Sequence, residues 1–215
     1  MREIENNALS EKLQGKFIVL DGPDGCGKST QTKLLAQRLR RQGIVTETFR
    51  DPGDTAIGEK IREILLNPEH LAMSTTTEVL LYMAARVQLW QEKIAPALEQ
   101  KKCVILDRWL SSTCAYQGYA GGFGMNQVKK LAADSLGMPW PDLTVIVDVD
   151  LETAANRFSE RPDRMEAKPR QYHEKVREGF LRLSLQQERI LVVDGTGGIE
   201  TVHERIKQII SETDF

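Results

Sequence analysis

Residues 16–41 read KFIVLDGPDGCGKSTQTKLLAQRLRR and join an apolar run, a glycine-rich loop and a helical pattern. Residues 22–29 match the pattern G-x-x-x-x-G-K-[ST] between a predicted strand and a predicted helix, which is the context that this pattern requires. Glycines let the backbone turn tightly and direct successive N–H groups at a phosphate, with the positive end of the helix behind them. The stretch therefore predicts a strand, a phosphate-binding loop and a helix that together hold a nucleoside triphosphate.

Each residue type in this loop suits a triphosphate. Lys28 reaches the β and γ oxygens, and the hydroxyl of Ser29 is a ligand for Mg²⁺. The chain contains no Asn-Lys-x-Asp segment of the kind that reads guanine, which disfavours a GTPase. The expected phosphate-binding set is Gly22, Pro23, Asp24, Gly25, Cys26, Gly27, Lys28, Ser29 and Thr30.

Apolar, strand-like segments alternate with helical patterns along the whole chain. The expected strands cover residues 16–20, 44–49, 103–106, 143–149 and 189–193, and one expected helix covers residues 28–41. Several of the strands are apolar almost throughout, which is typical of a parallel sheet covered on both faces. The pattern predicts an α/β protein: a P-loop NTPase fold of three α/β/α layers, with a five-stranded parallel sheet flanked by helices and a short lid.

Composition excludes several other classes of protein. Lys and Arg number 29 against 31 Asp and Glu, a net charge of −2, so no global basic field draws the chain to nucleic acid. No apolar run approaches the roughly 18 residues of a membrane-spanning helix. The polar start of the chain resembles no targeting signal, so the cytoplasm is the expected location. Three cysteines without metal-ligand spacing are expected to be reduced, packed thiols.

The length of 215 residues favours one domain. We expect a loosely held N-terminal extension over residues 1–15 and a single domain over residues 16–215. The polar stretch over residues 159–174, with a lid expected at about 159–170, has two interpretations. It is either a solvated surface loop or a mobile, arginine-bearing lid that closes over a phosphate.

Two further segments point to a second ligand. The apolar run 104–106 is followed by Asp107 and Arg108, and at the carboxyl end of a parallel strand Asp107 can face the magnesium sphere and Arg108 a phosphate, although such a pair by itself is more often a plain surface ion pair. A helix expected from about Thr76, with a capping box formed by Thr75 and Glu78, carries Tyr82 and Arg86 on one face. A ring beside a guanidinium suits a base, although core packing plus a surface charge explains the same pair.

Taken in order, these segments resemble the thymidylate kinase family, P-loop nucleoside monophosphate kinases that transfer the γ-phosphate of ATP to dTMP. The resemblance extends from about Lys16 to the last helix. Its most specific part is residues 107–118, DRWLSSTCAYQG, which is similar to the family's Asp-Arg-x-x-x-Ser-x-x-Ala-Tyr-Gln-Gly. Residues 50–53 (RDPG), 82–86 (YMAAR), 163–166 (DRME) and 176–180 (VREGF) also resemble family segments.

The resemblance implies a role for each matching residue. Asp24 accepts a hydrogen bond from the deoxyribose 3′-hydroxyl, and Tyr82 stacks on thymine while Arg86 donates to its O4 atom. Lys28 acts on the transferring phosphoryl group, and Asp107 holds Mg²⁺ together with Ser29, through a water molecule. The implied dTMP-binding set is Asp24, Arg50, Tyr82, Arg86, Arg108, Ser112 and Gln117, with Arg50 and Arg108 on the phosphate.

The resemblance also bears on the catalytic arginine. Some family members carry it in the phosphate loop, at a position that is Gly25 here. The arginine must then come from the lid, where Arg161 and Arg164 are the candidates. Arg108 is a further expected catalytic residue, outside the lid. Arg157 is expected to face adenine. Tyr82 stands where Phe is usual, and Asp54 stands where a second Gly is common.

A phosphate monoester needs no general base, because its second pKa is about 6 and it is largely ionised at neutral pH. Catalysis is expected to rest on positioning and charge neutralisation. The expected partners are ATP and dTMP, with Mg²⁺ as cofactor, and the resemblance implies a homodimer. Two other functions stay open: another P-loop nucleoside or nucleotide kinase, and a non-catalytic ATP-dependent switch.

Overall fold

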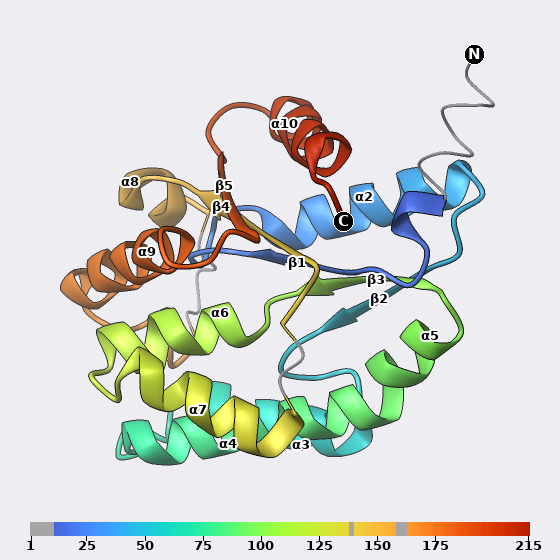
Figure 1. Ribbon diagram of the computed structural model, residues 1–215. Coiled ribbons are helices and arrows are strands. Elements are labelled where there is room, and N and C mark those ends of the chain that lie inside the picture. Colours follow the sequence, from blue (N-terminus) through green and yellow to red (C-terminus); the bar gives the residue numbers. More distant parts are fainter. Residues whose placement is uncertain (1–10, 138–139, 158–162) are drawn as a thin grey trace.

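The computed structural model describes residues 11–137, 140–157 and 163–215 (Figure 1). Its strands are β1 (Phe17–Asp21), β2 (Thr46–Arg50), β3 (Cys103–Asp107), β4 (Leu143–Asp148) and β5 (Ile190–Asp194). They form one parallel sheet in the order β2-β3-β1-β4-β5. The expected five-stranded parallel sheet is confirmed, and every strand boundary lies within two residues of its expected position.

Helices connect the strands and cover both faces of the sheet. The helices are α2 (Lys28–Arg41), α3 (Ala56–Leu66), α4 (Thr75–Leu89), α5 (Ala95–Glu99), α6 (Leu110–Thr113), α7 (Met125–Leu136), α8 (Leu151–Ala155), α9 (Arg170–Ser184) and α10 (Ile199–Glu212), with π-helical segments η1 (Trp90–Ile94) and η2 (Cys114–Ala120). Figure 1 shows α2 and α10 on one face of the sheet and α4, α5 and α7 on the other. None of the helices within the described residues has the length and apolar character to cross a bilayer.

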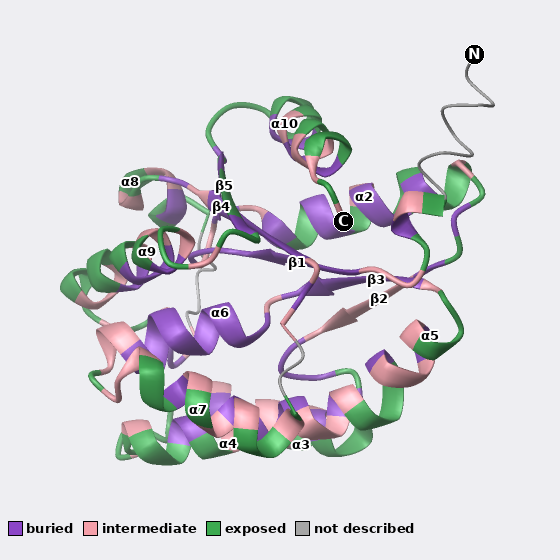
Figure 2. Ribbon diagram, in the orientation of Figure 1, coloured by how far each residue is buried: buried purple, intermediate pink, exposed green. Residues whose placement is uncertain are grey.

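The core divides into two hydrophobic clusters, one on each face of the sheet. Phe17 and Val19 of β1 belong to the cluster that α4, α7 and α9 cover, whereas Ile18 and Leu20 belong to the cluster that α2 and α10 cover. This division follows from the strand geometry, because successive side chains point to opposite faces. Figure 2 accordingly shows the central strands β1 and β3 as buried. All three cysteines are buried free thiols, as expected.

Helix α4, which carries the predicted base-binding pair, begins one residue before the expected start. Its N-cap is Ser74, whose hydroxyl accepts from the Thr77 amide at 3.1 Å, so the capping box expected from Thr75 and Glu78 is wrong. Both Ser and Thr suit an N-cap, and the sequence offers them in succession here. Glu78 is instead buried, at 3% exposure, and takes part in the site.

The segment before β1 is more firmly held than expected. Leu13 is fully buried in the cluster beneath α2 and α10, and the Gly15 amide donates to Lys101 O at 3.0 Å. Residues 11–15 therefore pack onto the domain, which differs from the expectation of a loose extension over residues 1–15. A single buried leucine in a polar stretch gives a weak sequence signal, because isolated surface leucines are common. Residues 1–10 lie outside the described residues.

Candidate active site

The predicted chemistry gathers at the carboxyl ends of β1 and β3. These strands are parallel neighbours in which Leu20 is paired with Asp107. Segments that follow parallel strands emerge at the same edge of the sheet, so the phosphate loop and Arg108 lie side by side. The Arg108 amide donates to Leu20 O at 3.1 Å, which fastens the two segments together.

The phosphate loop depends on its glycines. Gly22, Gly25 and Gly27 have φ angles of 137°, 75° and 94°, in the region that favours glycine. A Cβ atom on Gly22 would lie 2.5 Å from Val147 O, and one on Gly25 would collide with the carbonyl oxygen of Ala154 in α8. Position 25 therefore has no space for an arginine side chain in this structure, which agrees with the expectation that any catalytic arginine comes from elsewhere.

Lys28 is the first residue of α2 and is held over the loop. Its ammonium donates to Pro23 O at 3.0 Å, and the side chain is 6% exposed. The N-terminus of α2 adds the positive end of a helix of 14 residues to the same place. An anion in the loop would therefore meet a buried cation and a helix N-terminus together.

Ser29 and Asp107 line one shared groove beside the loop, together with Arg50 and Asp54. A hydroxyl and a carboxylate are oxygen ligands, and Mg²⁺ prefers such ligands and completes its sphere with water and phosphate oxygens. The pair therefore fits the expected magnesium site in its chemistry.

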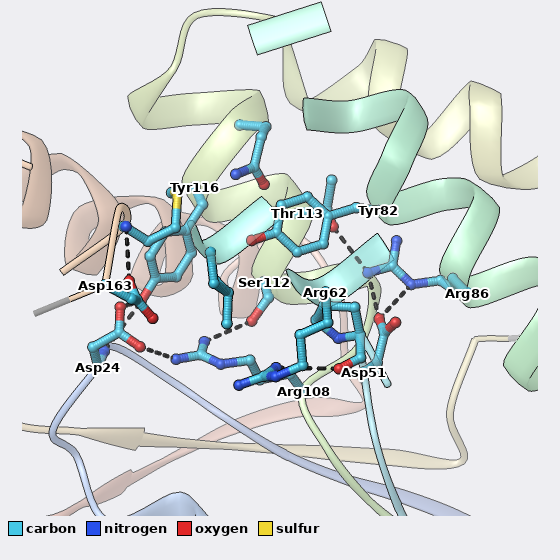
Figure 3. Close-up of a pocket in the computed structure, with 14 residues that line it drawn as sticks. Asp24, Asp51, Arg62, Tyr82, Arg86, Arg108, Ser112, Thr113, Tyr116 and Asp163 are labelled. Atoms are coloured by element: carbon cyan, nitrogen blue, oxygen red, sulfur yellow. Dashed lines mark hydrogen bonds and ion pairs between the residues drawn. The ribbon is translucent and has the colours of Figure 1, made fainter. Parts of the chain in front are cut away.

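Arg108 lines a second pocket, which Figure 3 shows. Its lining comprises Asp24, Asp51, Pro52, Arg62, Leu66, Tyr82, Arg86, Arg108, Ser112, Thr113, Tyr116, Gln117, Asp163 and Met165. Six of the seven predicted dTMP-binding residues line it: Asp24, Tyr82, Arg86, Arg108, Ser112 and Gln117. Residues from six separate segments of the chain are thus brought to one pocket.

Arg108 joins the phosphate loop to this pocket. Its guanidinium donates to Gly22 O at 3.2 Å and Ser112 Oγ at 2.9 Å, forms an ion pair with Asp24, and lies 5.3 Å from the centre of the Tyr116 ring. Its φ of 69° is in the left-handed region, which is uncommon for a residue with a side chain. Backbone outliers of this kind gather at functional sites.

Asp24 is the corresponding acidic residue of the loop. Tyr116 donates its hydroxyl to Asp24 Oδ2 at 2.7 Å and accepts from the Asp24 amide at 3.0 Å. Burial raises the pKa of Asp24, but the charges of Arg108 and Lys28 outweigh burial and hold the pKa below its usual value. The carboxylate is therefore ionised and lines the pocket as a hydrogen-bond acceptor.

Arg86 is buried, at 1% exposure, so its interpretation as a surface charge does not hold. It forms an ion pair with Asp51 and donates to Thr113 Oγ1 at 2.9 Å and to Trp109 O at 3.2 Å. Its Nη1 atom is buried without a hydrogen-bond partner, so its N–H groups remain for a ligand. Tyr82 lines the same pocket, one helical turn before Arg86 (Figure 3).

Arg50 does not line this pocket. It forms an ion pair with Glu59 at 2.8 Å and faces the groove that contains Ser29 and Asp107. Arg62 of α3 lines the pocket in its place and donates to Pro52 O at 3.1 Å. Burial and the neighbouring charges of Arg50 and Arg108 lower the pKa of Arg62. Three guanidiniums that repel one another favour a bound anion. Arg62 is four residues after Gly58 and three before Leu65, which are both buried, so the helical spacing could have indicated that Arg62 lies on the inward face of α3.

Of the two arginines predicted to act from the lid, the structure describes only Arg164. Arg161 lies outside the described residues. Arg164 is 2% exposed, forms an ion pair with Glu78 at 2.5 Å, and donates to Leu65 O at 2.7 Å. This placement differs from the expectation of a catalytic arginine, because Nη1 and Nε are buried against a carboxylate and a carbonyl oxygen and the residue does not line the pocket, although its buried Nη2 atom has no hydrogen-bond partner.

Arg157 lies beside the phosphate loop and does not line the pocket. Its Nη1 atom donates to Gly25 O at 3.2 Å and Cys26 O at 3.4 Å. It lines a groove with Thr30 and with residues between β5 and α10. This position is compatible with the predicted adenine contact.

Comparisons with known proteins agree on one family. The family model described as thymidylate kinase matches residues 20–206. A thymidylate kinase from Caldanaerobacter subterraneus subsp. tengcongensis is 43% identical over 202 residues, covering 93% of this chain and 97% of that protein. One from Symbiobacterium thermophilum is 41% identical over 198 residues, covering 91% and 92%. The crystal structure of thymidylate kinase from Ehrlichia chaffeensis superposes with a TM-score of 0.75 at 30% identity, covering 91% of this chain and 98% of that one.

Proposed function

The chain belongs to the thymidylate kinase family and phosphorylates dTMP to dTDP, with ATP as the second substrate, and we propose that the pocket beside Arg108 binds dTMP. The observation that carries the proposal is the position of Arg108, which contacts the phosphate loop at Gly22 and Asp24 and also lines the pocket. A phosphate held by Arg108 in the pocket lies next to a phosphate held in the loop. Phosphoryl transfer requires this proximity.

The pocket offers complementary groups to each part of dTMP. The free Nη1 atom of Arg86 is a donor for thymine O4, and Tyr82 supplies a ring face for the base. The ionised Asp24 is an acceptor for the 3′-hydroxyl, and Arg108 and Arg62 face the phosphate. Arg50 is better assigned to the groove beside Ser29 than to direct contact with dTMP.

The acceptor oxygen needs no general base, because a phosphate monoester is largely ionised above its second pKa of about 6. The barrier comes from bringing two anionic phosphates together. Lys28, which is buried, and Arg108, which is partly buried, supply positive charge beside both sites, and this charge is already in place before the reaction. The chain's own residues therefore act by positioning the phosphates and by neutralising charge.

On the ATP side we propose that residues 22–30 bind the triphosphate and that Arg157 contacts adenine. Ser29 and Asp107 would hold Mg²⁺, with Asp107 acting through a water molecule. The ion supplies charge neutralisation at the phosphate oxygens. Arg161 stays a predicted catalytic residue on the basis of the family resemblance alone.

A coupled ATP-consumption assay with dTMP, dUMP, dCMP and dGMP tests the site assignment. An arginine donor matches thymine O4 but meets the amino donor of cytosine, so kcat/KM for dCMP should be lower by at least about a hundredfold. dUMP lacks only the methyl group and should lose about tenfold to a hundredfold. Comparable values for dCMP and dTMP would remove the assignment of Arg86. ATP binding without transfer to any monophosphate would favour the switch function instead.

We also propose that two copies of the chain associate through the outer face of α3 and α4. Ile57, Ile64 and Leu80 on these helices are large apolar side chains with exposures of 53%, 42% and 54%. Apolar surface of this kind favours association, because contact with a second copy removes it from water. Sedimentation should give a dimer, and the double variant Ile64→Glu with Leu80→Glu should be monomeric. Leu185→Glu, at a residue that is 87% exposed on another surface, is the control.

A further inference from the structure

Glu78 of α4 is a buried carboxylate with both oxygens engaged. It is 3% exposed. Its Oε1 atom accepts from Arg164 Nη1 at 2.5 Å, and its Oε2 atom accepts from Gln117 Nε2 at 3.0 Å. A buried carboxylate needs such partners, because its charge is costly to remove from water. Glu78 therefore connects the segment after residue 162 with a residue of the predicted base pocket.

Arg164 is fastened by its backbone as well as by its side chain. Its amide donates to Leu66 O at 3.1 Å and its Nε atom donates to Leu65 O at 2.7 Å, both at the end of α3. The residues on either side, Asp163 and Met165, line the pocket. Arg164 itself does not line the pocket, and its contacts fix two neighbours that do.

Gln117 has its amide orientation set by the same carboxylate. A carboxylate paired with arginine only accepts hydrogen bonds, so the NH₂ group of Gln117 must face Glu78. The amide oxygen, Oε1, then becomes the group that Gln117 can offer to a ligand in the pocket. An acceptor at this position suits the N3–H donor of thymine and repels the N3 lone pair of cytosine.

We propose that Arg164 is a positioning residue, which holds Glu78 in place and thereby fixes the amide of Gln117 for recognition of a pyrimidine with an N3–H group. This inference rests on the proposed binding of dTMP in the pocket. It makes the ion pair of Arg164 and Glu78 a determinant of base specificity. It also separates Arg164 from the arginine that acts on the transferring phosphoryl group.

The test compares Arg164→Met and Glu78→Gln, which keep the side-chain size and remove one charge each, with their double variant. Arg182→Met is the matched control, because Arg182 forms an exposed ion pair with Glu178 on α9 and lies outside the site. The measurements are kcat, KM for dTMP and for dCMP, and the Kd for dTMP and ATP from equilibrium titration. The ATP Kd reports whether each variant keeps its fold.

Both single variants should raise the KM and Kd for dTMP by about tenfold or more and reduce the preference for dTMP over dCMP by about tenfold. The ATP Kd should stay within about threefold of wild type. The double variant should lose less than the product of the two single losses, because both act through one interaction. The control should match wild type in every measurement.

The opposite pattern, in which kcat falls and the KM for dTMP does not change, would overturn the inference. A hundredfold loss of kcat in Arg164→Met, with the KM for dTMP and the base preference unchanged, is the pattern of a group acting only in the transition state. Wild-type-like behaviour of Glu78→Gln would overturn it as well. Failure of the proposed function is distinguishable, since wild-type protein would then show no saturable dTMP binding before any variant is compared.

Discussion

Arg86 and Asp51 form an ion pair in which each side chain is 1% exposed. Burial raises the pKa of Asp51, and the charge of Arg86 opposes that shift. Arg86→Met would leave the carboxylate without its partner, so it should lower the free energy of unfolding by about 3–5 kcal/mol. It should also raise the KM for dTMP far more than the KM for ATP. Urea denaturation and steady-state kinetics measure both effects, and a variant as stable as wild type would show that the pair is not needed.

The pH dependence of activity should follow the substrate rather than the protein. The pKa of Asp24 lies below its usual value, because Arg108 and Lys28 outweigh the effect of burial, so Asp24 stays ionised as the pH falls from 7 to about 5. The phosphate of dTMP takes up a proton near pH 6. The acid limb of kcat/KM for dTMP should therefore have its midpoint near 6. Asp24→Asn should lower the plateau and leave this midpoint in place, and a midpoint shift of more than about one unit would contradict the assignment.

Motifs predict residues best where local geometry determines their position. Lys28 and Ser29 follow directly from the loop and the helix after it, and the structure brings Arg86 and Arg108 to one pocket as expected. Arg62 and Arg164 differ, because their environments depend on how α3 packs against distant segments. A polar stretch predicts a solvated arginine, whereas Glu78 offers Arg164 a buried partner 86 positions away in the sequence.

At the scale of elements, α8 is the segment that confines the phosphate loop. Gly25 has φ of 75°, and a Cβ atom there would collide with the carbonyl oxygen of Ala154. Gly43 has a similar φ of 82° but nothing within 4 Å of the corresponding Cβ position, so it provides a matched control. Gly43→Ala should cost about 1–2 kcal/mol of stability through backbone strain alone.

Gly25→Ala should cost clearly more than Gly43→Ala and should also weaken ATP binding, since α8 must move to admit the methyl group. Thermal unfolding and ATP titration of both variants measure the difference. Equal losses of stability, with ATP binding intact in Gly25→Ala, would show that α8 gives way at little cost.

The π-helical segment η2 is the element that the sequence indicates least. It carries Tyr116 and Gln117 into the pocket, and its chain is held by contacts with α7 and α9. Segments of this type are rare and often occur at functional sites, and no residue pattern distinguishes them from an α-helix. The strands are different, because their apolar runs depend only on burial on both faces. Fold and motif residues could therefore be predicted, while the contacts within the pocket could not.

At the scale of the whole molecule, the phosphate loop and the proposed dTMP pocket lie next to each other at the carboxyl end of β3. β3 lies between β1 and β2, so the residue after it, Arg108, stands between the phosphate loop after β1 and the Asp51–Pro52 turn after β2. In parallel sheets, ligands bind beyond the carboxyl ends of the strands. The strand order thus accounts for the proximity of two phosphate sites that the sequence separates by many residues.

The same core also includes the segment that precedes β1. Leu13 is fully buried in the cluster that Leu35 of α2 and Ile206 of α10 complete. Leu13→Ala should lower the free energy of unfolding by about 2–5 kcal/mol, because a buried leucine loses its packing and leaves a cavity. Leu185→Ala is the control, since that side chain is 87% exposed and makes no core contact to lose. Urea unfolding of both variants gives the comparison, and equal stability of the two would show that residues 11–15 are loosely held after all.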